Sequence, residues 1–460
     1  MAKTPTDEFA SNSAAALSGS PPLGAGPDGP TFMGHPRGLG TLFFTEMWER
    51  FSYYGMRALL VLFMTDAIAT HGLGFTVERA AAVYGLYTAA VYLTTLPGGW
   101  IADNVLGQRK AVLWGGVIIA AGHFSMAIPK LTTFYLGLLL IVLGTGLLKP
   151  NVSAMVGELY EGEEGARRDA GFSIFYMGIN LGAFLAPLVT GFLGQKINWH
   201  LGFAAAGIGM VIGLIQYVAG GKYLGDAGLA PEQHDEATLA RKRTYLYIGL
   251  VVTAVVIAAL VIADVSVVAV TTVLGYVIAF GTLLYLFGLL MSGGLTRDEK
   301  KRVAVIGVFF LAAAVFWSGF EQAGSSLNLV AEKLTDLNFF GWEAPASFLQ
   351  SVNPLFIIIL APVFAWLWVY LSNKHLEPSS PLKFGAGLVL LGAGFVVMFF
   401  AAGAARSGQP ISPMWLVVTY FLHTTGELTL SPVGLSKVTQ LSPKRLVSQM
   451  MGVWFLASSL

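Results

Sequence analysis

The chain contains no cysteine, and only 12% of its 460 residues are charged. The lack of cysteine excludes disulfides, thiolate zinc sites and catalysis by a thiol. A water-soluble chain is typically about one quarter charged, so the scarcity of charge excludes an ordinary soluble domain. The net charge of +1 gives no reason to expect nucleic acid as a partner, and the seven histidines show no metal-ligand spacing. We therefore expect no metal or organic cofactor.

Apolar residues take the place of the missing charges. They make up 55% of the chain, and its mean hydropathy is +0.68. Runs long enough to cross a bilayer as helices recur along the whole chain. They lie near 41–65, 79–102, 110–128, 132–155, 170–193, 201–221, 245–263, 267–291, 303–325, 347–371, 384–403 and 412–438. A last run starts near Val447 and is cut off at Leu460. The pattern predicts an all-α polytopic protein embedded in a lipid bilayer.

Lysine and arginine gather in alternate connections, for example at 109–110, 167–168 and 297–302. Because cytoplasmic loops of membrane proteins are enriched in these residues, we expect the N-terminus to lie in the cytoplasm. We expect the protein to lie in the cell (inner) membrane. Residues 1–38 are rich in Ser, Pro, Gly and Ala and lack the features of a signal peptide, so we expect a disordered cytoplasmic tail.

The order of the runs indicates two halves. Residues 39–222 are expected to form an N-terminal six-helix bundle, and 301–460 a C-terminal bundle. Between them, 223–300 holds a polar linker and two apolar runs with few polar groups, which predicts a lipid-facing insertion of two helices.

The most informative polar residues fall inside the first apolar run, at offsets 0, 3, 4, 7, 8 and 11. At about 100° per residue these offsets place all of them on one stripe of a helix. They are Glu46, Glu49, Arg50, Tyr53, Tyr54 and Arg57. An ionised group facing lipid at the bilayer centre costs about 2.5–3.5 kcal/mol or more, so the stripe is expected to face a wet cavity or other helices. It could hold protons and a zwitterion, or it could be a static structural clamp.

Three further ionisable residues lie within predicted spans. Lys149 needs a carboxylate such as Glu46 or Glu49 if it is buried, or it could reach the headgroups instead. Glu321, near the outer end of its span, and Glu427, at mid-span, are isolated acids in the second half. Either could pair with Arg57 across the halves as a gate. Each could also be a neutral, hydrogen-bonded acid.

Uncharged polar residues extend this set. Asn180 and Asn353 are expected at mid-span and could bind an amine or peptide bond, or hold helices together. Tyr87 and Trp317 could line a pocket or only pack. Asp103, in GGWIADNVLGQRK, is expected to act in conformational change by pairing with nearby helix ends.

Several segments resemble those of one family. EMWERFSYYGMR is similar to the ExxERFxYYG signature of the proton-coupled oligopeptide transporters. Further segments resemble the family in the expected order: GTGLLKPNVS, FSIFYMGINLGAFLAP, FEQAGSS, SVNPLFIIILAP and GELTLSPVGLS. The resemblance implies a major facilitator fold of two six-helix bundles plus two inserted helices, and uptake of di- and tripeptides driven by protons. Family members have twelve core helices, and the chain stops within the eleventh, so we expect the second bundle to be incomplete.

The resemblance also implies residue roles. Arg57, Lys149 and Tyr54 would face the peptide carboxylate, and Asn180, Asn353 and Glu427 its amino terminus. The implied proton-coupling residues are Glu46, Glu49, Arg50, Lys149 and Glu321. Glu321 would form a gate with Arg57, and Tyr53, Tyr87 and Trp317 would line the pocket.

Other functions remain open. The same fold could carry nitrate or a drug, although nitrate would make no use of the acidic residues. A peptide-binding transceptor is a second alternative, but no ordered cytoplasmic module is predicted. A membrane enzyme is not expected, because no nucleophile–base motif occurs, and nothing in the sequence indicates an obligate protein partner.

Overall fold

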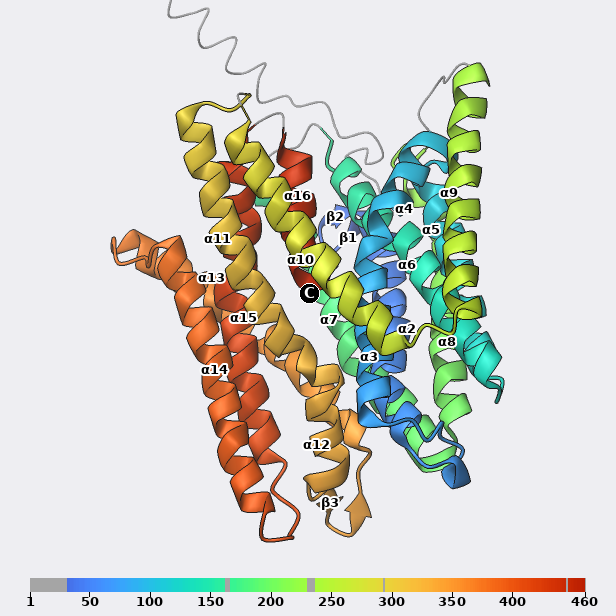
Figure 1. The fold of residues 1–460 in the computed structure, drawn as a ribbon. Coiled ribbons are helices and arrows are strands. Elements are labelled where there is room, and N and C mark those ends of the chain that lie inside the picture. The colour runs from blue at the N-terminus through green and yellow to red at the C-terminus, as the bar shows by residue number, and fades with distance from the viewer. Residues whose placement is uncertain (1–30, 162–165, 230–235, 293, 444–445, 460) are drawn as a thin grey trace, which may run out of the picture.

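The computed structural model describes residues 31–161, 166–229, 236–292, 294–443 and 446–459. Long helices form two bundles that stand side by side (Figure 1). The first bundle contains α2 Arg37–Thr65, α3 Val77–Leu93, α4 Thr95–Ile101, α5 Gln108–Met126, α6 Leu131–Glu158, α7 Ala166–Gly191 and α8 Trp199–Gly220. The second contains α11 Arg297–Phe320, α12 Ser326–Leu334, α13 Val352–Asn373, α14 Ser380–Ala405, α15 Met414–Leu441 and α16 Val447–Leu456.

Local sequence sets many of the helix boundaries. Thr296 and Glu299 form a reciprocal capping box at the start of α11, so that two backbone N–H groups of the first turn are satisfied. Asn198 accepts from the backbone N–H of His200 at the start of α8. Short elements complete the chain. They are β1 Thr31–Phe32, β2 His35–Pro36, η1 Ile68–Thr70, η2 Ala102–Leu106, η3 Phe192–Ile197, η4 Gly221–Tyr223, η5 Glu321–Gly324, β3 Asn338–Phe339, β4 Trp342–Glu343, η6 Ala346–Ser351 and η8 Ala457–Ser459.

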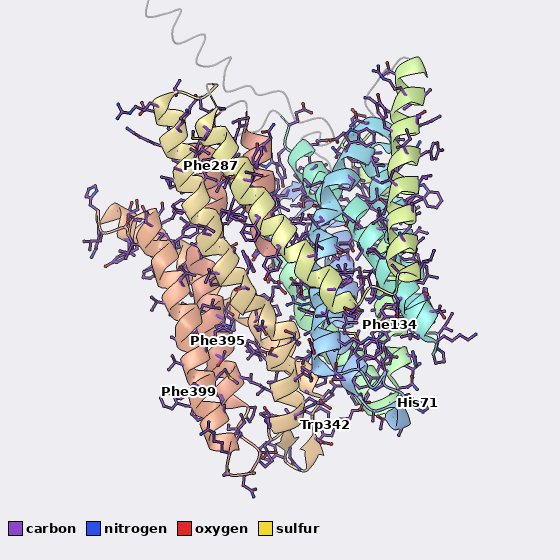
Figure 2. The ribbon with its side chains drawn as sticks, in the orientation of Figure 1. His71, Phe134, Phe287, Trp342, Phe395 and Phe399 are labelled. Carbon is purple, nitrogen blue, oxygen red and sulfur yellow. The ribbon has the colours of Figure 1, made fainter. Side chains whose placement is uncertain are left out.

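The predicted spans coincide with helices, but 79–102 is divided between α3 and α4, and 303–325 between α11 and η5. Eight helical segments of the described residues are long and apolar enough to cross a membrane. Exposed aromatic side chains such as Phe287 and Phe399 cover the outer surface (Figure 2). An apolar exterior of this kind suits a hydrocarbon environment. The chain is thus a multi-pass membrane protein.

The two inserted helices are α9 Glu236–Ile262 and α10 Val267–Met291. Most described side chains of α9 are exposed, and those from Tyr245 onward are mainly apolar, in agreement with the predicted lipid-facing position. Helix α10 instead runs obliquely between the bundles (Figure 1). Its Thr271 donates to the carbonyl of Ala82 in α3 at 3.0 Å, and its Leu286 joins the core of the second bundle. The insertion therefore includes one helix that packs against both bundles.

The prediction of a disordered tail is wrong for residues 31–38. Positions 1–30 lie outside the described residues, but 31–36 form an antiparallel hairpin and α2 begins at Arg37. Met33 and Gly34 make the turn with φ values of 51° and 81°. The hairpin is held because Phe32 packs 5.5 Å from the ring of Phe43 and His35 hydrogen-bonds the Tyr160 hydroxyl at 2.8 Å. Composition alone could not show these distant partners.

The two bundles meet at the lower side in Figure 1, where α12 packs on α2. Leu327 and Ala331 of α12 join one buried cluster with Leu60 of α2. Asn328 is fully buried there, and its amide donates to the carbonyl of Ala58 at 2.8 Å. Other hydrogen bonds also link the bundles, such as Gln195 to Glu332 at 2.9 Å and Ser351 to the Phe184 carbonyl at 2.7 Å. The protein is therefore closed on that side.

Helix α4 approaches α6 so closely that only glycine fits at one position. A Cβ atom on Gly98 would overlap the carbonyl of Gly146, whereas one on Gly99 would meet nothing within 4 Å. We expect Gly98→Ala to destabilise the protein by about 1–3 kcal/mol, because the backbone of α6 cannot yield as a flexible side chain would. Gly99→Ala is the matched control and should leave the thermal unfolding midpoint in detergent nearly unchanged. Equal midpoints for both variants would contradict this packing.

Candidate functional site

The charged cluster on α2 is present as predicted. Arg50 lies between two acids, with Nε 3.3 Å from Glu46 Oε1 and Nη2 2.6 Å from Glu49 Oε1. All three residues are buried. The i,i+4 spacing of Glu46 and Arg50 brings their side chains together on one helix face. The other oxygen of Glu46 has no hydrogen-bond partner among the described residues, which leaves it available to carry a proton.

Lys149 does not make the predicted ion pair with Glu46 or Glu49 in this conformation. Its Nζ lies 4.5 Å from the centre of the Tyr92 ring, and no described carboxylate lies within 4.0 Å of it. Arg50 already occupies the two acids, and the aromatic face supplies a cation–π contact instead. The sequence could not reveal this arrangement, because Tyr92 comes from another helix.

Arg57 and Glu321 form an ion pair that links the two bundles. Arg57 Nη2 donates to Glu321 Oε2 at 2.6 Å, and both side chains are largely buried. The Tyr84 hydroxyl accepts from Arg57 Nε at 2.7 Å and lies 3.3 Å from the same oxygen of Glu321. Of the two acids considered, Glu321 is thus the partner of Arg57.

The position of Glu321 differs from the prediction. We expected it near the end of a span, but α11 stops at Phe320 and the chain continues through η5 into α12. Glu321 therefore lies at a break within one long crossing. Gly324 permits this approach, because a Cβ atom there would overlap the Tyr84 hydroxyl and lie 2.9 Å from Arg57 Nε.

Glu427 forms a second polar group with residues of α13 and α15. The Asn353 amide donates to Thr424 Oγ1 at 2.8 Å and reaches Glu427 Oε2 at 3.5 Å. Asn353 lies in the first turn of α13, rather than at mid-span as expected. No described cation lies within 4.0 Å of Glu427, so its carboxyl group is free to receive a positively charged ligand.

A cavity of about 140 Å³ lies between the bundles and joins these groups. Seven of the predicted residues line it together. They are Tyr54, Arg57, Asn180, Trp317, Glu321, Asn353 and Glu427. The first bundle contributes a cation and the second contributes acids. Such a cavity suits a small molecule that carries both a carboxylate and an ammonium group.

Some predicted residues lie outside this cavity. Tyr53 and Tyr87 do not line it. They stack on each other at 6.1 Å within the buried cluster that also contains Leu327 of α12. Lys149 is separated from it by Tyr92, and the cluster of Glu46, Glu49 and Arg50 lies outside the lining as well. The ionisable groups of α2 therefore divide between a cavity-lining part and a buried part.

Sequence reasoning missed other residues that line the cavity. They include Tyr92, Tyr176, Phe320, Gln350, Tyr420 and His423. Helical spacing could have found two of them, since Tyr176 and His423 each lie four residues before a predicted site residue. Asn180 even donates to the Tyr176 carbonyl at 3.0 Å. Gln350 lies in the short 3₁₀ helix η6, where α-helical spacing does not apply.

Asp103 is exposed and makes no hydrogen bond or ion pair with any described residue, which is contrary to the predicted pairing. Arg109 anchors this region instead. Its Nε donates to the Ala227 carbonyl at 2.6 Å, and its guanidinium also reaches the Gly225 carbonyl. Backbone carbonyls within 221–229 therefore hold the segment around Arg109. No sequence motif predicts a contact with backbone atoms of this kind.

Comparison with known proteins agrees with this architecture. The model of the POT family matches residues 109–460. The chain belongs to the family of proton-dependent oligopeptide transporters, and its fold is the major facilitator fold.

Two curated relatives illustrate the similarity. A peptide transporter of Yersinia enterocolitica is 44% identical over 448 residues, covering 94% of this chain and 87% of that protein. A di-/tripeptide transporter of Lactococcus lactis subsp. cremoris is 39% identical over 444 residues, covering 93% and 88%. A crystal structure of the peptide transporter POT in complex with sulfate superimposes with a TM-score of 0.87 at 45% identity, covering 94% of this chain and 87% of that one.

Proposed function

We propose that this protein is a proton-coupled symporter that imports di- and tripeptides across the cell membrane by alternating access. One observation carries the proposal: Arg57 from the first bundle and Glu427 from the second line the same cavity. A peptide is a zwitterion whose two charges lie at opposite ends, so it needs a cation and an acid on opposite walls. The names of the related transporters support the same substrate class.

In this proposal the peptide carboxylate binds near Arg57 and Tyr54, and the amino terminus near Glu427, Asn353 and Asn180. The cavity wall between them is largely aromatic, with Trp317 and Tyr176. Such a wall accepts varied side chains, while the charged ends supply the fixed contacts. Lys149 would reach the carboxylate only if the Tyr92 ring moved aside.

Proton coupling would act on the ion pair that closes the lower side. A peptide carboxylate competes with Glu321 for Arg57, and a proton on Glu321 removes its charge. Either event weakens the contact between the bundles. Proton and peptide thus favour the same change, which coupling requires, because a ligand shifts an equilibrium only through different affinities for two states. Glu46, Glu49, Arg50 and Lys149 would form a second proton-accepting group.

The enrichment of Lys and Arg in alternate loops supports an N-terminus in the cytoplasm. The closed lower side would then face outward, so the described conformation would be open toward the cell interior. Nitrate is a weaker candidate substrate, because Glu427 would repel it and nitrate carries no positive group to bind that acid.

The position of Glu427 predicts a specific requirement for a free amino terminus. Uptake of labelled dialanine should be inhibited by unlabelled dialanine at least about tenfold better than by N-acetyl-dialanine, because loss of a charged hydrogen-bond partner costs about 1.5–3 kcal/mol. In Glu427→Gln this preference should shrink to about twofold. Glu332→Gln is the matched control, since Glu332 lies outside the cavity and bonds Gln195. A preference that persists in Glu427→Gln, or inhibition by nitrate rather than peptide, would contradict the proposal.

A further inference from the structure

A second cavity, of about 620 Å³, opens between the start of α2 and the end of α8 at the upper side of the first bundle. We call it the α2–α8 groove. The residues that define it are Phe32, Arg37, Phe44, Gln216, Lys222 and Tyr223. It lies at the opposite end of α2 from Arg57 and shares no lining residue with the cavity between the bundles.

Two cations gather around a single aromatic ring in this groove. The guanidinium carbon of Arg37 lies 3.9 Å from the centre of the Tyr223 ring, and Lys222 Nζ lies 5.1 Å from the same point. Both cations are exposed, and neither pairs with a described carboxylate within 4.0 Å. Two cations that share one ring and have no described carboxylate partner attract an anion.

The groove floor offers polar groups of the right kind. Thr45 donates to Gln216 Oε1 at 3.2 Å, and no described residue accepts from the Gln216 side-chain amide. Thr41 donates to the Gly220 carbonyl at 3.2 Å, which fixes the two helices against each other. Gln216 can therefore donate to an oxygen that enters between the helices.

The surface next to the groove is apolar and follows the same two helices. Phe44 is 38% exposed, Ile215 65% and Val218 63%. The segment Trp199–Tyr223 is long and apolar enough to cross a membrane, so Lys222 and Tyr223 lie at its very end, where headgroups meet hydrocarbon. Charge at the end and apolar side chains along the span match the two parts of a lipid.

We propose that the α2–α8 groove binds an anionic phospholipid, with its phosphate between Arg37 and Lys222 and its acyl chains along Phe44, Ile215 and Val218. Basic residues at the bilayer surface attract anionic headgroups. A lipid in this position would contact the hairpin 31–36 through Phe32 and hold the start of the helix that carries Glu46, Glu49, Arg50 and Arg57.

The test measures lipid retained by the full chain after reconstitution in an equal mixture of phosphatidylglycerol and phosphatidylcholine and extraction in mild detergent. Native mass spectrometry gives the ratio of the two bound lipids. We expect the wild type to favour phosphatidylglycerol, and Arg37→Gln with Lys222→Gln to lower that ratio by about tenfold or more. Lys110→Gln with Arg302→Gln is the matched control. It removes the same net charge from two exposed cations outside the groove and should retain the preference.

Several results would overturn the proposal. One is an unchanged ratio in the groove variant, and another is an equal loss in the control, which would mean that net charge alone attracts the lipid. Full displacement by glycerol phosphate at millimolar concentration would identify a site for soluble anions instead. If lipid preference arises only after residues 1–30 are removed, the groove binds the chain's own tail. Dialanine uptake by both variants confirms that they are folded, so a change in lipid ratio is not a folding defect.

Discussion

Replacing Arg57 with glutamate, or Glu321 with arginine, should each lower proton-driven dialanine uptake by about 100-fold, and the double exchange should restore part of it. Each single change leaves like charges facing one another between the bundles, and loss of one partner of a buried ion pair costs about 3–5 kcal/mol. The double exchange recreates an attraction across the same 2.6 Å contact. The recovery should be incomplete, because the exchange reverses the donor and acceptor around Tyr84 and moves the cation of the substrate site to the second bundle.

A matched control for this experiment exists on the same side of the protein. Lys196 and Glu343 also join the two bundles, with Nζ and Oε2 3.1 Å apart, but Glu343 is 75% exposed. Exposed pairs contribute only about 0–1 kcal/mol. Exchanging Lys196 and Glu343, singly or together, should therefore change uptake by less than about fivefold. If the Arg57–Glu321 double exchange recovers nothing, or if the control pair matters as much, the pairing does not act as a gate.

Neutralising the buried cluster on α2 should separate peptide binding from proton coupling. We expect Glu49→Gln to abolish accumulation of dialanine against a gradient, a loss of about 100-fold, because Arg50 then loses a buried charged partner. Binding of dialanine, measured by calorimetry, should change by less than about threefold, since none of Glu46, Glu49 and Arg50 lines the cavity.

Glu158→Gln provides the control for this change. Glu158 is an exposed acid of the same bundle, at the end of α6, and it accepts hydrogen bonds from Gln108 and the Gly228 backbone. Its neutralisation should leave accumulation within about twofold of the wild type. A Glu49→Gln protein that still concentrates peptide would show that the cluster is a structural clamp, and equal losses of binding and accumulation would remove its separate role in coupling.

The sequence was sufficient to predict features that depend on a single helix. The stripe from Glu46 to Arg57 follows from helical spacing alone, and the structure places it on one face of α2 with the expected contact of Arg50 to both acids. The apolar runs likewise become helices, because segments this long and apolar have no other way to satisfy their backbone in lipid.

Features that depend on contacts between distant segments were missed. The break at Glu321 arises because α12 must turn to pack on α2, and Gly324 lets the chain approach Tyr84. The cation–π contact of Lys149 needed knowledge of where Tyr92 lies. Tyr53 and Tyr87 carry hydroxyl groups that suit a binding site, yet each ring serves as the packing partner of the other.

The most direct test of proton-coupled import is uptake of labelled dialanine into proteoliposomes, with and without an acidic exterior and an inside-negative potential. We expect dialanine to accumulate above its external concentration only when the gradient is imposed. Addition of a protonophore should abolish this accumulation. Equilibration of dialanine that ignores the gradient would show a passive facilitator and contradict the coupling that Glu321 and the α2 cluster are proposed to provide.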